Sequence, residues 1–531
     1  MMVERFKRDL IKEFRNYDRM MLMQDLMAGL TVTAVAIPLA LAFGVGSGAT
    51  AASGLVTAII AGVIISALGG AYFQISGPTG AMAAILMSII AQYGLQGVFV
   101  ATVLAGIILV IAGVLHLGKL ISFIPMPVIS GFTSGIAVII AMGQIDNFFG
   151  VTSKGSSVTE KFLSYWQLGF EPNMTAVSIG LFVMLMMLLF PMRYSKYIPS
   201  SLFAIIVATA ANIALNLDVA VVGNIPATLI LDDRLELASL LDFRTVIGLL
   251  AMIESLLCGA TASRMTGARL DSNRELLAQG IGNIIVPFFG GIPATAAIAR
   301  TSVAVKSGAV TRLTGIFHAL GILLAMFVLA PVMSQIPLAA LAGVLMVVSW
   351  RMNEWVTINF ILKGKFKGAI LKFVVTMLTT IIVDLTTAIM IGVIIGLVLQ
   401  AVRFSHLRIT YDEIDPQRLH EEIEDLPDDG LVCYINGPIV FANTERLEEI
   451  PKKAKRYGYV YFSMRGVPDI DISGVQEFAK IVQEMKDAGK KIYLCSLQDE
   501  AMEMLKRGGV YDMIGQDAVY WSVERALLHR H

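Results

Sequence analysis

Cysteine and charge are both scarce in this 531-residue chain, and neither charge sign is in excess. Its three cysteines, Cys258, Cys433 and Cys495, share no close spacing, so the sequence predicts neither a disulfide framework nor a zinc site. Charged residues make up 15% of the chain, and the 41 basic residues balance the 41 acidic ones. This balance says nothing about nucleic acid, and we expect no nucleic-acid partner. The GxxxxGK[ST] motif of nucleotide-binding loops is also missing.

What the chain has instead is long apolar stretches. Hydrophobic residues make up 56% of the chain and the mean hydropathy is +0.73, which is too apolar for a soluble protein of this length. Several runs contain no Asp, Glu, Lys or Arg and are long enough, with their flanks, to span a bilayer: 31–43, 98–115, 177–190 and 317–332. We count about fourteen such segments before Arg403. The sequence therefore predicts an α-helical polytopic membrane protein with a charged, soluble tail.

Basic residues predict how the chain is oriented. Six of them precede the first apolar segment: Arg5, Lys7, Arg8, Lys12, Arg15 and Arg19. The positive-inside rule places such an N-terminus in the cytoplasm, and an even number of spans returns the tail there. Many spans follow this basic start, so we expect no removable signal peptide. The predicted parts are a cytoplasmic segment 1–19, a transmembrane domain 20–403 and a cytoplasmic domain 404–531.

Two apolar segments are interrupted in a similar way. Each places a proline, small residues and a threonine where a spanning helix would normally be continuous: Ser76-Gly77-Pro78-Thr79-Gly80-Ala81 and Gly291-Ile292-Pro293-Ala294-Thr295-Ala296-Ala297. The two prolines lie 215 positions apart (293 minus 78). Paired interruptions of this kind are typical of transporters built from repeats, in which discontinuous helices meet at a binding site near the midplane.

Other features recur at a similar offset. The 215-residue offset sets Pro38 against Ile253, next to Glu254, and an offset of 212 sets Pro125 against Pro337. We therefore predict two halves, 20–217 and 235–403, of seven spans each, with the second half inverted because seven is odd. The alternative is chance recurrence of proline-bounded apolar segments.

Inverted halves would bring two helix N-termini face to face. We expect helices to begin near Pro78 and Pro293, with each proline in the first turn. Their free N–H groups and positive dipole ends would then converge on one place that prefers an anion. The alternative is that the prolines only kink helices for packing. The predicted substrate-binding residues are Gly77, Pro78, Thr79, Gly80, Ala81, Pro293, Ala294, Thr295, Ala296, Ala297 and Arg300.

Charged residues inside the apolar segments are few. Glu254 interrupts the run 246–258, and an intramembrane carboxylate is a functional hypothesis by default. We predict that it binds the coupling ion, H+ or Na+, with no other cofactor or metal; alternatively it pairs with a basic residue or caps a helix. Arg300 adds a positive field at the anion site, snorkels to the interface or balances the charge of Glu254. His318 is predicted to be a packing residue with satisfied hydrogen bonds.

Several motifs, in order, resemble the SulP (sulfate permease, solute carrier 26) family of anion transporters. They begin at Asp25, Ile75, Pro127, Arg269 and Ala299, and read DLMAGLTV, ISGPTG, PVISGF, RLDSNREL and ARTS. The resemblance covers essentially the whole chain. It implies about fourteen helices in a seven-plus-seven inverted repeat, a core and a gate domain, and elevator-like movement of the core. It also implies an anion held by the backbone at 79–81 and 295–297, a coupling carboxylate at Glu254 and the tenth-helix basic residue at Arg300.

The resemblance leaves several substrates open. Many members have glutamine where Leu39 follows Pro38, so one polar contact is missing here. The stretches around Glu254 and Arg300 look most like the bacterial dicarboxylic acid branch, whereas 37–43 resembles the bicarbonate branch. The prediction is no enzyme but a secondary active transporter of dicarboxylate, sulfate or bicarbonate in a bacterial inner membrane, working as an H+ symporter. Alternatives are a Na+-coupled bicarbonate symporter, an uncoupled exchanger or channel, or a regulatory scaffold.

The tail alternates strand-like and helix-like segments. Apolar runs at 431–435, 459–462 and 491–495 alternate with helical patterns near 444–455, 474–488 and 499–507, which predicts an α/β domain. The tail resembles a STAS domain, including Asp471-Ile472-Ser473-Gly474. Ser473 and Gln476 fit a capping box for the next helix. We expect the tail to support a homodimer or to bind cytoplasmic partners, and the rest of the chain to contact membrane lipid.

Overall fold

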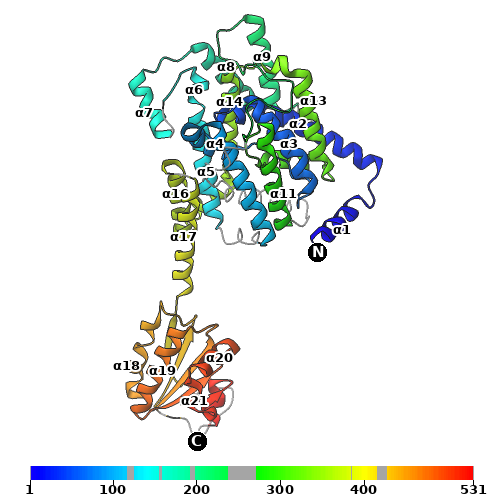
Figure 1. The fold of residues 1–531 in the computed structure, drawn as a ribbon. Helices are drawn as coiled ribbons and strands as arrows, with labels where there is room; N and C mark the ends of the chain where they lie inside the picture. The colour runs from blue at the N-terminus through cyan, green and yellow to red at the C-terminus, as the bar shows by residue number, and fades with distance from the viewer. Residues whose placement is uncertain are drawn as a thin grey trace. The chain divides into compact units, whose positions relative to one another are not determined.

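The computed structural model describes residues 2–116, 125–154, 158–191, 198–236, 271–383, 385–414, 427 and 429–529. The chain divides into two compact units, Met1–Ile394 and Ile395–His531 (Figure 1). Glu254, the predicted coupling carboxylate, and Cys258 lie outside the described residues.

The first unit is helical. Its described helices are α1 (Met2–Phe14), α2 (Arg19–Gly46), α3 (Ala51–Leu68), α4 (Gly80–Val114), α5 (Met126–Gly143), α6 (Ile145–Phe149), α7 (Val158–Leu168), α8 (Met174–Leu189), α9 (Ser200–Leu215), α11 (Ser272–Ile285), α12 (Ile298–Lys306), α13 (Leu313–Met333), α14 (Leu338–Met352), α15 (Trp355–Lys363), α16 (Lys367–Ile382) and α17 (Leu385–Phe404). Two short strands, β1 (Ser76–Gly77) and β2 (Thr295–Ala296), interrupt this series.

Six described stretches are long and apolar enough to cross a membrane: Arg19–Gly46, Ala51–Leu68, Tyr93–Val114, Met126–Phe149, Leu313–Met333 and Thr387–Phe404. The helices α8, α9 and α14 are apolar but shorter. Almost all of the four charge-free runs falls in α2, α4, α8 and α13, so their predicted helical character is confirmed. The count of about fourteen spans stays a prediction.

Glycines let two of these helices approach closely. A Cβ atom added to Gly106 of α4 would lie 2.6 Å from the carbonyl oxygen of Gly280 in α11, and one added to Gly280 would lie 2.6 Å from that of Gly106. Small residues at a membrane helix contact allow backbones to pack at short range. This contact lies after Gly94, where the backbone of α4 is not helical, and it matters below because α11 carries side chains that reach the candidate site.

The N-terminal helix α1 docks on the ends of other helices through charge. Glu13 and Arg312 form an ion pair of 2.7 Å, with 2% and 3% of their side chains exposed. Asp9 contacts Arg274 at 3.3 Å. The Phe6 ring lies 4.4 Å from the Arg274 guanidinium carbon. Because the Glu13 pair is buried, removing one partner would leave a costly unpaired charge.

The second unit is an α/β domain. Its five-stranded sheet has the order β3 (Arg408–Glu413), β4 (Gly430–Asn436), β5 (Tyr459–Gly466), β6 (Lys491–Cys495) and β7 (Val519–Tyr520). The strand β3 is antiparallel to β4, and the remaining neighbours are parallel. Side chains of α18 (Glu449–Lys453), α19 (Ile472–Asp487), α20 (Asp499–Arg507) and α21 (Val510–Ile514) join the larger apolar core, and α22 (Val523–Leu528) joins a smaller one. The predicted alternation of strands and helices is confirmed.

Two details of the second unit bear on the sequence predictions. The capping box at Ser473 is wrong: Asp471 is the N-cap of α19 and accepts a 2.7 Å hydrogen bond from the Gly474 amide. Asp471 takes this place because α19 begins at Ile472, two residues earlier than a cap at Ser473 requires. Burial raises the pKa of the Cys433 and Cys495 thiols to about 12, so both stay protonated and unreactive at neutral pH.

The glycine contact between α4 and α11 yields a stability prediction. We expect Gly280→Val to lower the thermal midpoint of the purified protein strongly, because its side chain would collide with the α4 backbone. Thermal unfolding followed by size-exclusion chromatography measures this effect. Ile107→Val, at the exposed neighbour of Gly106, is the control and should leave the midpoint nearly unchanged. A Gly280→Val protein as stable as the parent would show that the two helices do not meet there.

Candidate functional site

The two interrupted segments lie against each other. Strands β1 and β2 pair antiparallel, with Ser76 opposite Ala296 and Gly77 opposite Thr295. The pairing continues beyond the strands, since the Ala297 amide donates to the Ile75 carbonyl at 2.8 Å. An antiparallel crossing is the arrangement expected of two inverted halves. Sequence positions more than 200 residues apart therefore meet, as the matching motifs suggested.

Each strand leads into a helix. Thr79 is the N-cap of α4 but makes no capping hydrogen bond with its side chain. Its hydroxyl oxygen instead lies 3.0 Å from that of Thr295, and both side chains are buried. The helix α12 follows β2 with Ala297 as its N-cap. The two predicted threonines are thus brought together between two helix N-termini.

The prolines do not occupy first helical turns, contrary to the prediction. Helix α4 begins at Gly80, after Pro78, and α12 begins only at Ile298, well after Pro293. The reason is that the intervening residues are extended and satisfy their backbone groups by pairing between β1 and β2. The Ala297 amide is bonded to the Ile75 carbonyl, so an anion at the N-terminus of α12 would be bound by amides of the residues that follow Ala297.

Buried polar side chains of α11 and α3 hold the β2 segment. Asn283 of α11 accepts from the Ala294 amide and donates to the Ala294 carbonyl, both at 2.8 Å. Thr57 of α3 accepts from the Ile292 amide at 2.8 Å and donates to its carbonyl at 3.0 Å. Sequence reasoning missed both residues. Asn283 could have been found from the sequence, because Gln279 and Asn283 are polar residues spaced four apart and so lie on one face of a helix.

Arg300 is the buried charge of the site. It is 1% exposed, and its guanidinium donates a 2.5 Å hydrogen bond to the Pro78 carbonyl. Gly77 leaves the room for it, because a Cβ there would lie 2.6 Å from an Arg300 nitrogen. The predicted alternative of snorkelling to the interface does not fit this position. Arg300 therefore ties α12 to the residues that precede α4 and places a positive charge beneath β1.

The N-terminus of α4 faces three other helices. A Cβ on Gly80 would meet Ile140 of α5 at 2.3 Å, Phe43 of α2 at 3.3 Å and Met352 of α14 at 3.4 Å. A larger residue at position 80 would require these side chains to move. Two helix N-termini, each carrying about half a positive charge, and one guanidinium lie together in an apolar setting. Such an arrangement can bind a small anion through backbone amides.

His318 of α13 differs from its prediction. The side chain is fully buried, as expected of a packing residue. Neither ring nitrogen, however, has a hydrogen-bond partner among the described residues, so the predicted satisfaction of its hydrogen bonds is wrong. Its backbone carbonyl accepts from Thr33 at 3.0 Å, which fixes the helix but not the ring.

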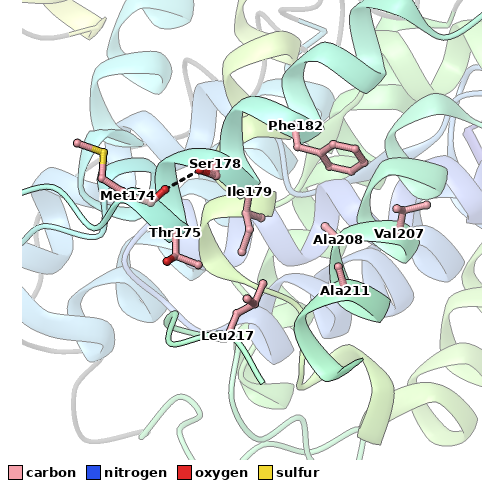
Figure 2. A pocket seen from close by; sticks show the side chains of 9 residues that line it. All are labelled: Met174, Thr175, Ser178, Ile179, Phe182, Val207, Ala208, Ala211 and Leu217. Carbon is pink, nitrogen blue, oxygen red and sulfur yellow. Dashed lines mark hydrogen bonds between the residues drawn. The ribbon is translucent and has the colours of Figure 1, made fainter. Parts of the chain in front are cut away.

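A separate cavity of about 550 Å³ lies between α8 and α9 (Figure 2). Its lining is almost wholly apolar and includes none of the predicted site residues: Met174, Thr175, Ser178, Ile179, Phe182, Val207, Ala208, Ala211 and Leu217. No charged side chain lines it, so it lacks the groups that an anion needs. The paired N-termini are the better candidate site.

The chain is similar to members of known protein families over most of its length. The pattern of the sulfate permease family matches residues 22–376, and that of the STAS domain matches 421–526. The putative sulfate transporter YvdB of Bacillus subtilis is 35% identical over 528 residues, covering 95% of this chain and 97% of the relative. A bicarbonate transporter, BicA, of Picosynechococcus is 29% identical over 534 residues, covering 95% and 94%.

Solved structures show the same fold. Murine solute carrier 26 family member A9, an anion transporter, superposes with a TM-score of 0.83 at 18% identity, covering 97% of this chain and 92% of that one. The transmembrane domain of a cyanobacterial bicarbonate transporter, BicA, gives a TM-score of 0.62 at 30% identity, covering 72% and 98%. The first likeness supports the fold alone, since its identity is low.

Fold and site together define a multi-pass membrane transport protein with a C-terminal α/β domain, rather than an enzyme. The chain belongs to the sulfate permease family of anion transporters, and its C-terminal unit is a STAS domain. The relatives described above are named for sulfate and bicarbonate, and none of these is named for a dicarboxylate.

The support of β2 by α11 can be tested by removing one side chain. We expect Asn283→Leu to leave both backbone groups of Ala294 unpaired, at a cost of about 1–3 kcal/mol for each buried group. The thermal midpoint should fall, and stabilisation by added sulfate or bicarbonate should be lost.

Asn212→Leu is the matched control, because Asn212 also donates to a backbone carbonyl, that of Gln335, away from β2. It should lower the midpoint but keep the stabilisation by anions. Equal anion-dependent stabilisation in both variants would show that Asn283 does not support the binding site.

Proposed function

We propose that the protein is a secondary active transporter that binds one small anion between the N-termini of α4 and α12. The observation that carries the proposal is the antiparallel pairing of β1 with β2, which brings the Thr79 and Thr295 hydroxyls to 3.0 Å. The anion would accept hydrogen bonds from first-turn amides of both helices and from these hydroxyls. The predicted residues from Gly77 to Ala81 and from Pro293 to Ala297 all belong to these two segments.

Arg300 supports an anionic ligand without having to touch it. Its guanidinium is buried against the Pro78 carbonyl, so its charge acts through a medium of low polarity rather than through water. A buried cation raises the affinity for any anion nearby, whatever its shape. The amides and hydroxyls would then select for size and geometry.

Transport would use an elevator-like movement of the helices that carry the site. The coupling ion is H+ in this proposal, bound at Glu254, with Na+ as the alternative. The protein would act in a bacterial inner membrane, with both termini in the cytoplasm as the basic N-terminal residues suggest. A homodimer and cytoplasmic partners of the STAS domain are further parts of the proposal.

The substrate is proposed as sulfate, bicarbonate or a dicarboxylate. Relatives with 35% and 29% identity are named for sulfate and for bicarbonate, which favours these two. Leu39 offers no polar atom to the substrate, which counts against a ligand that needs many hydrogen bonds there. A dicarboxylate would suit a site with one buried guanidinium and two helix N-termini.

Uptake into proteoliposomes tests the proposal. Labelled bicarbonate, sulfate and succinate are offered separately, with the pH gradient and the Na+ gradient set independently. We expect concentrative uptake of one of them, driven by an inward proton gradient. Channel-like currents, or uptake that depends only on an opposing anion, would overturn the symport mechanism and favour an uncoupled channel or exchanger.

The role of Glu254 has its own prediction. We expect Glu254→Gln to bind anion but to lose gradient-driven accumulation, because a neutral amide cannot carry the coupling proton. Glu354→Gln is the control, since Glu354 accepts a hydrogen bond from the Ser130 hydroxyl at 3.0 Å. Accumulation that responds to the gradient equally in both variants would remove Glu254 from the coupling mechanism.

A further inference from the structure

A second carboxylate lies deep in the first unit. Glu275, in the first turn of α11, is fully buried. One of its oxygens accepts from the Gly70 amide at 3.0 Å, and the other accepts from the Gln279 side chain at 2.9 Å and from the Gln74 side chain. All three donors are neutral, so the carboxylate has hydrogen bonds but no opposite charge from them.

The charged groups around Glu275 are engaged elsewhere. Arg274 contacts Asp9 and the Leu68 carbonyl, and Arg312 pairs with Glu13. Asp271 accepts from the Arg274 amide as the N-cap of α11, and Tyr72 lies near Arg312. The helices α3 and α4, which pack on α11, contain no Asp, Glu, Lys or Arg. In the part of the chain that the structure describes, no basic side chain forms an ion pair with Glu275.

The hydrogen bonds of this cluster leave two acceptors without donors. The side-chain carbonyl oxygens of Gln74 and Gln279 are both buried and have no partner among the described residues. A glutamine amide can rotate to present its oxygen instead of its nitrogen. If one glutamine rotated, a proton on Glu275 would supply the donor that its amide oxygen needs. The hydrogen-bond patterns before and after this rotation therefore differ by one proton.

The cluster is connected to the strand that precedes α4. The Gln279 side chain also donates to the Ser76 hydroxyl at 2.8 Å, and Ser76 is the first residue of β1. If Gln279 rotates, its oxygen would accept from both Glu275 and Ser76, so the direction of both hydrogen bonds reverses. Gln74 lies next to Ile75, whose backbone carbonyl and amide are bonded to Ala297 and Thr301. A change at Glu275 thus reaches both paired segments.

We propose that Glu275 takes up and releases a proton during the transport cycle, as a proton site distinct from Glu254. In the uptake step the carboxylate accepts H+ and becomes a carboxylic acid, whose O–H donates to the rotated Gln279 side chain. The buried charge is lost, and the hydrogen bond from Gln279 to Ser76 changes direction. Protonation therefore alters how α11 holds β1, which leads into the anion site. That this step occurs within a transport cycle rests on the proposed function, whereas the titration of Glu275 does not.

Infrared difference spectroscopy of the purified full chain tests the titration directly. Spectra are recorded between about pH 5 and about pH 9, a range in which buried glutamates are known to titrate. We expect the carbonyl band of a protonated carboxylic acid to grow as the pH falls, and Glu275→Gln to lose one component of that band. Glu354→Gln is the matched control and should retain this component.

A second variant keeps the carboxyl group. Gln74→Met removes one hydrogen-bond partner, so the Glu275 band should persist but move in frequency. Gln144→Met, at another buried glutamine, should leave the band in place. If Glu275→Gln folds poorly, the frequency shift in Gln74→Met still decides the question. A difference spectrum without a component assignable to Glu275 in either comparison would overturn the proposal.

The transport assay separates this proposal from the proposed function. With Glu254→Gln, loss of gradient-driven accumulation and an intact Glu275 band would support two separate proton sites. With Glu275→Gln, uptake of the transported anion should lose most of its dependence on pH. If no anion is accumulated by the parent protein, the proposed symport fails while the infrared result on Glu275 still stands or falls by itself.

Discussion

The pairing of β1 with β2 is the contact on which the rest of the first unit depends. A polypeptide that breaks its helices inside a membrane protein exposes N–H and C=O groups that no lipid can satisfy. Here the two breaks satisfy each other: Gly77 faces Thr295 and Ser76 faces Ala296. The remaining groups are bonded to side chains of α3 and α11, as at Ile292 and Ala294. By helix geometry, the first-turn amides of α4 and α12 point out of the N-terminus of their helix, and that is where a ligand can bind.

The same constraint accounts for the unusual composition around the strands. Arg300 can be buried only because Gly77 leaves room beside it and the Pro78 carbonyl accepts from it. Glycines at 106 and 280 let α11 pack closely on the part of α4 that follows Gly94, and polar side chains of α11 reach the breaks. Glu275, Gln279 and Asn283 then form one polar row along α11 that reaches both segments. The candidate anion site, the α11 side chains that hold its two segments and the proposed proton site at Glu275 are therefore connected by hydrogen bonds.

Much of this system could be predicted from the sequence, but not all of it. The matching interruptions led to the expectation that the segments of Thr79 and Thr295 converge, and their hydroxyl oxygens lie 3.0 Å apart. The extended conformation of Thr295 and Ala296 before α12 was not predicted. Proline favours the first turn of a helix, and the neighbouring residues carry no pattern that predicts a strand of two residues. The contacts of α11 were missed because they are long-range: Gln279 and Ser76 are 203 residues apart. The prediction that Ser473 caps α19 was wrong because Asp471, two residues earlier, is also a good N-cap residue.

The position of the anion can be measured directly. Crystals of the full chain would be grown with selenate, after selenate has been shown to compete with a transported anion, and the selenium atom located by its anomalous scattering. If the anion binds between the two helix N-termini, the selenium peak will lie between the first turns of α4 and α12, close to the hydroxyls of Thr79 and Thr295. A selenium peak in the cavity between α8 and α9, or at any other place away from these two turns, would contradict the site described here.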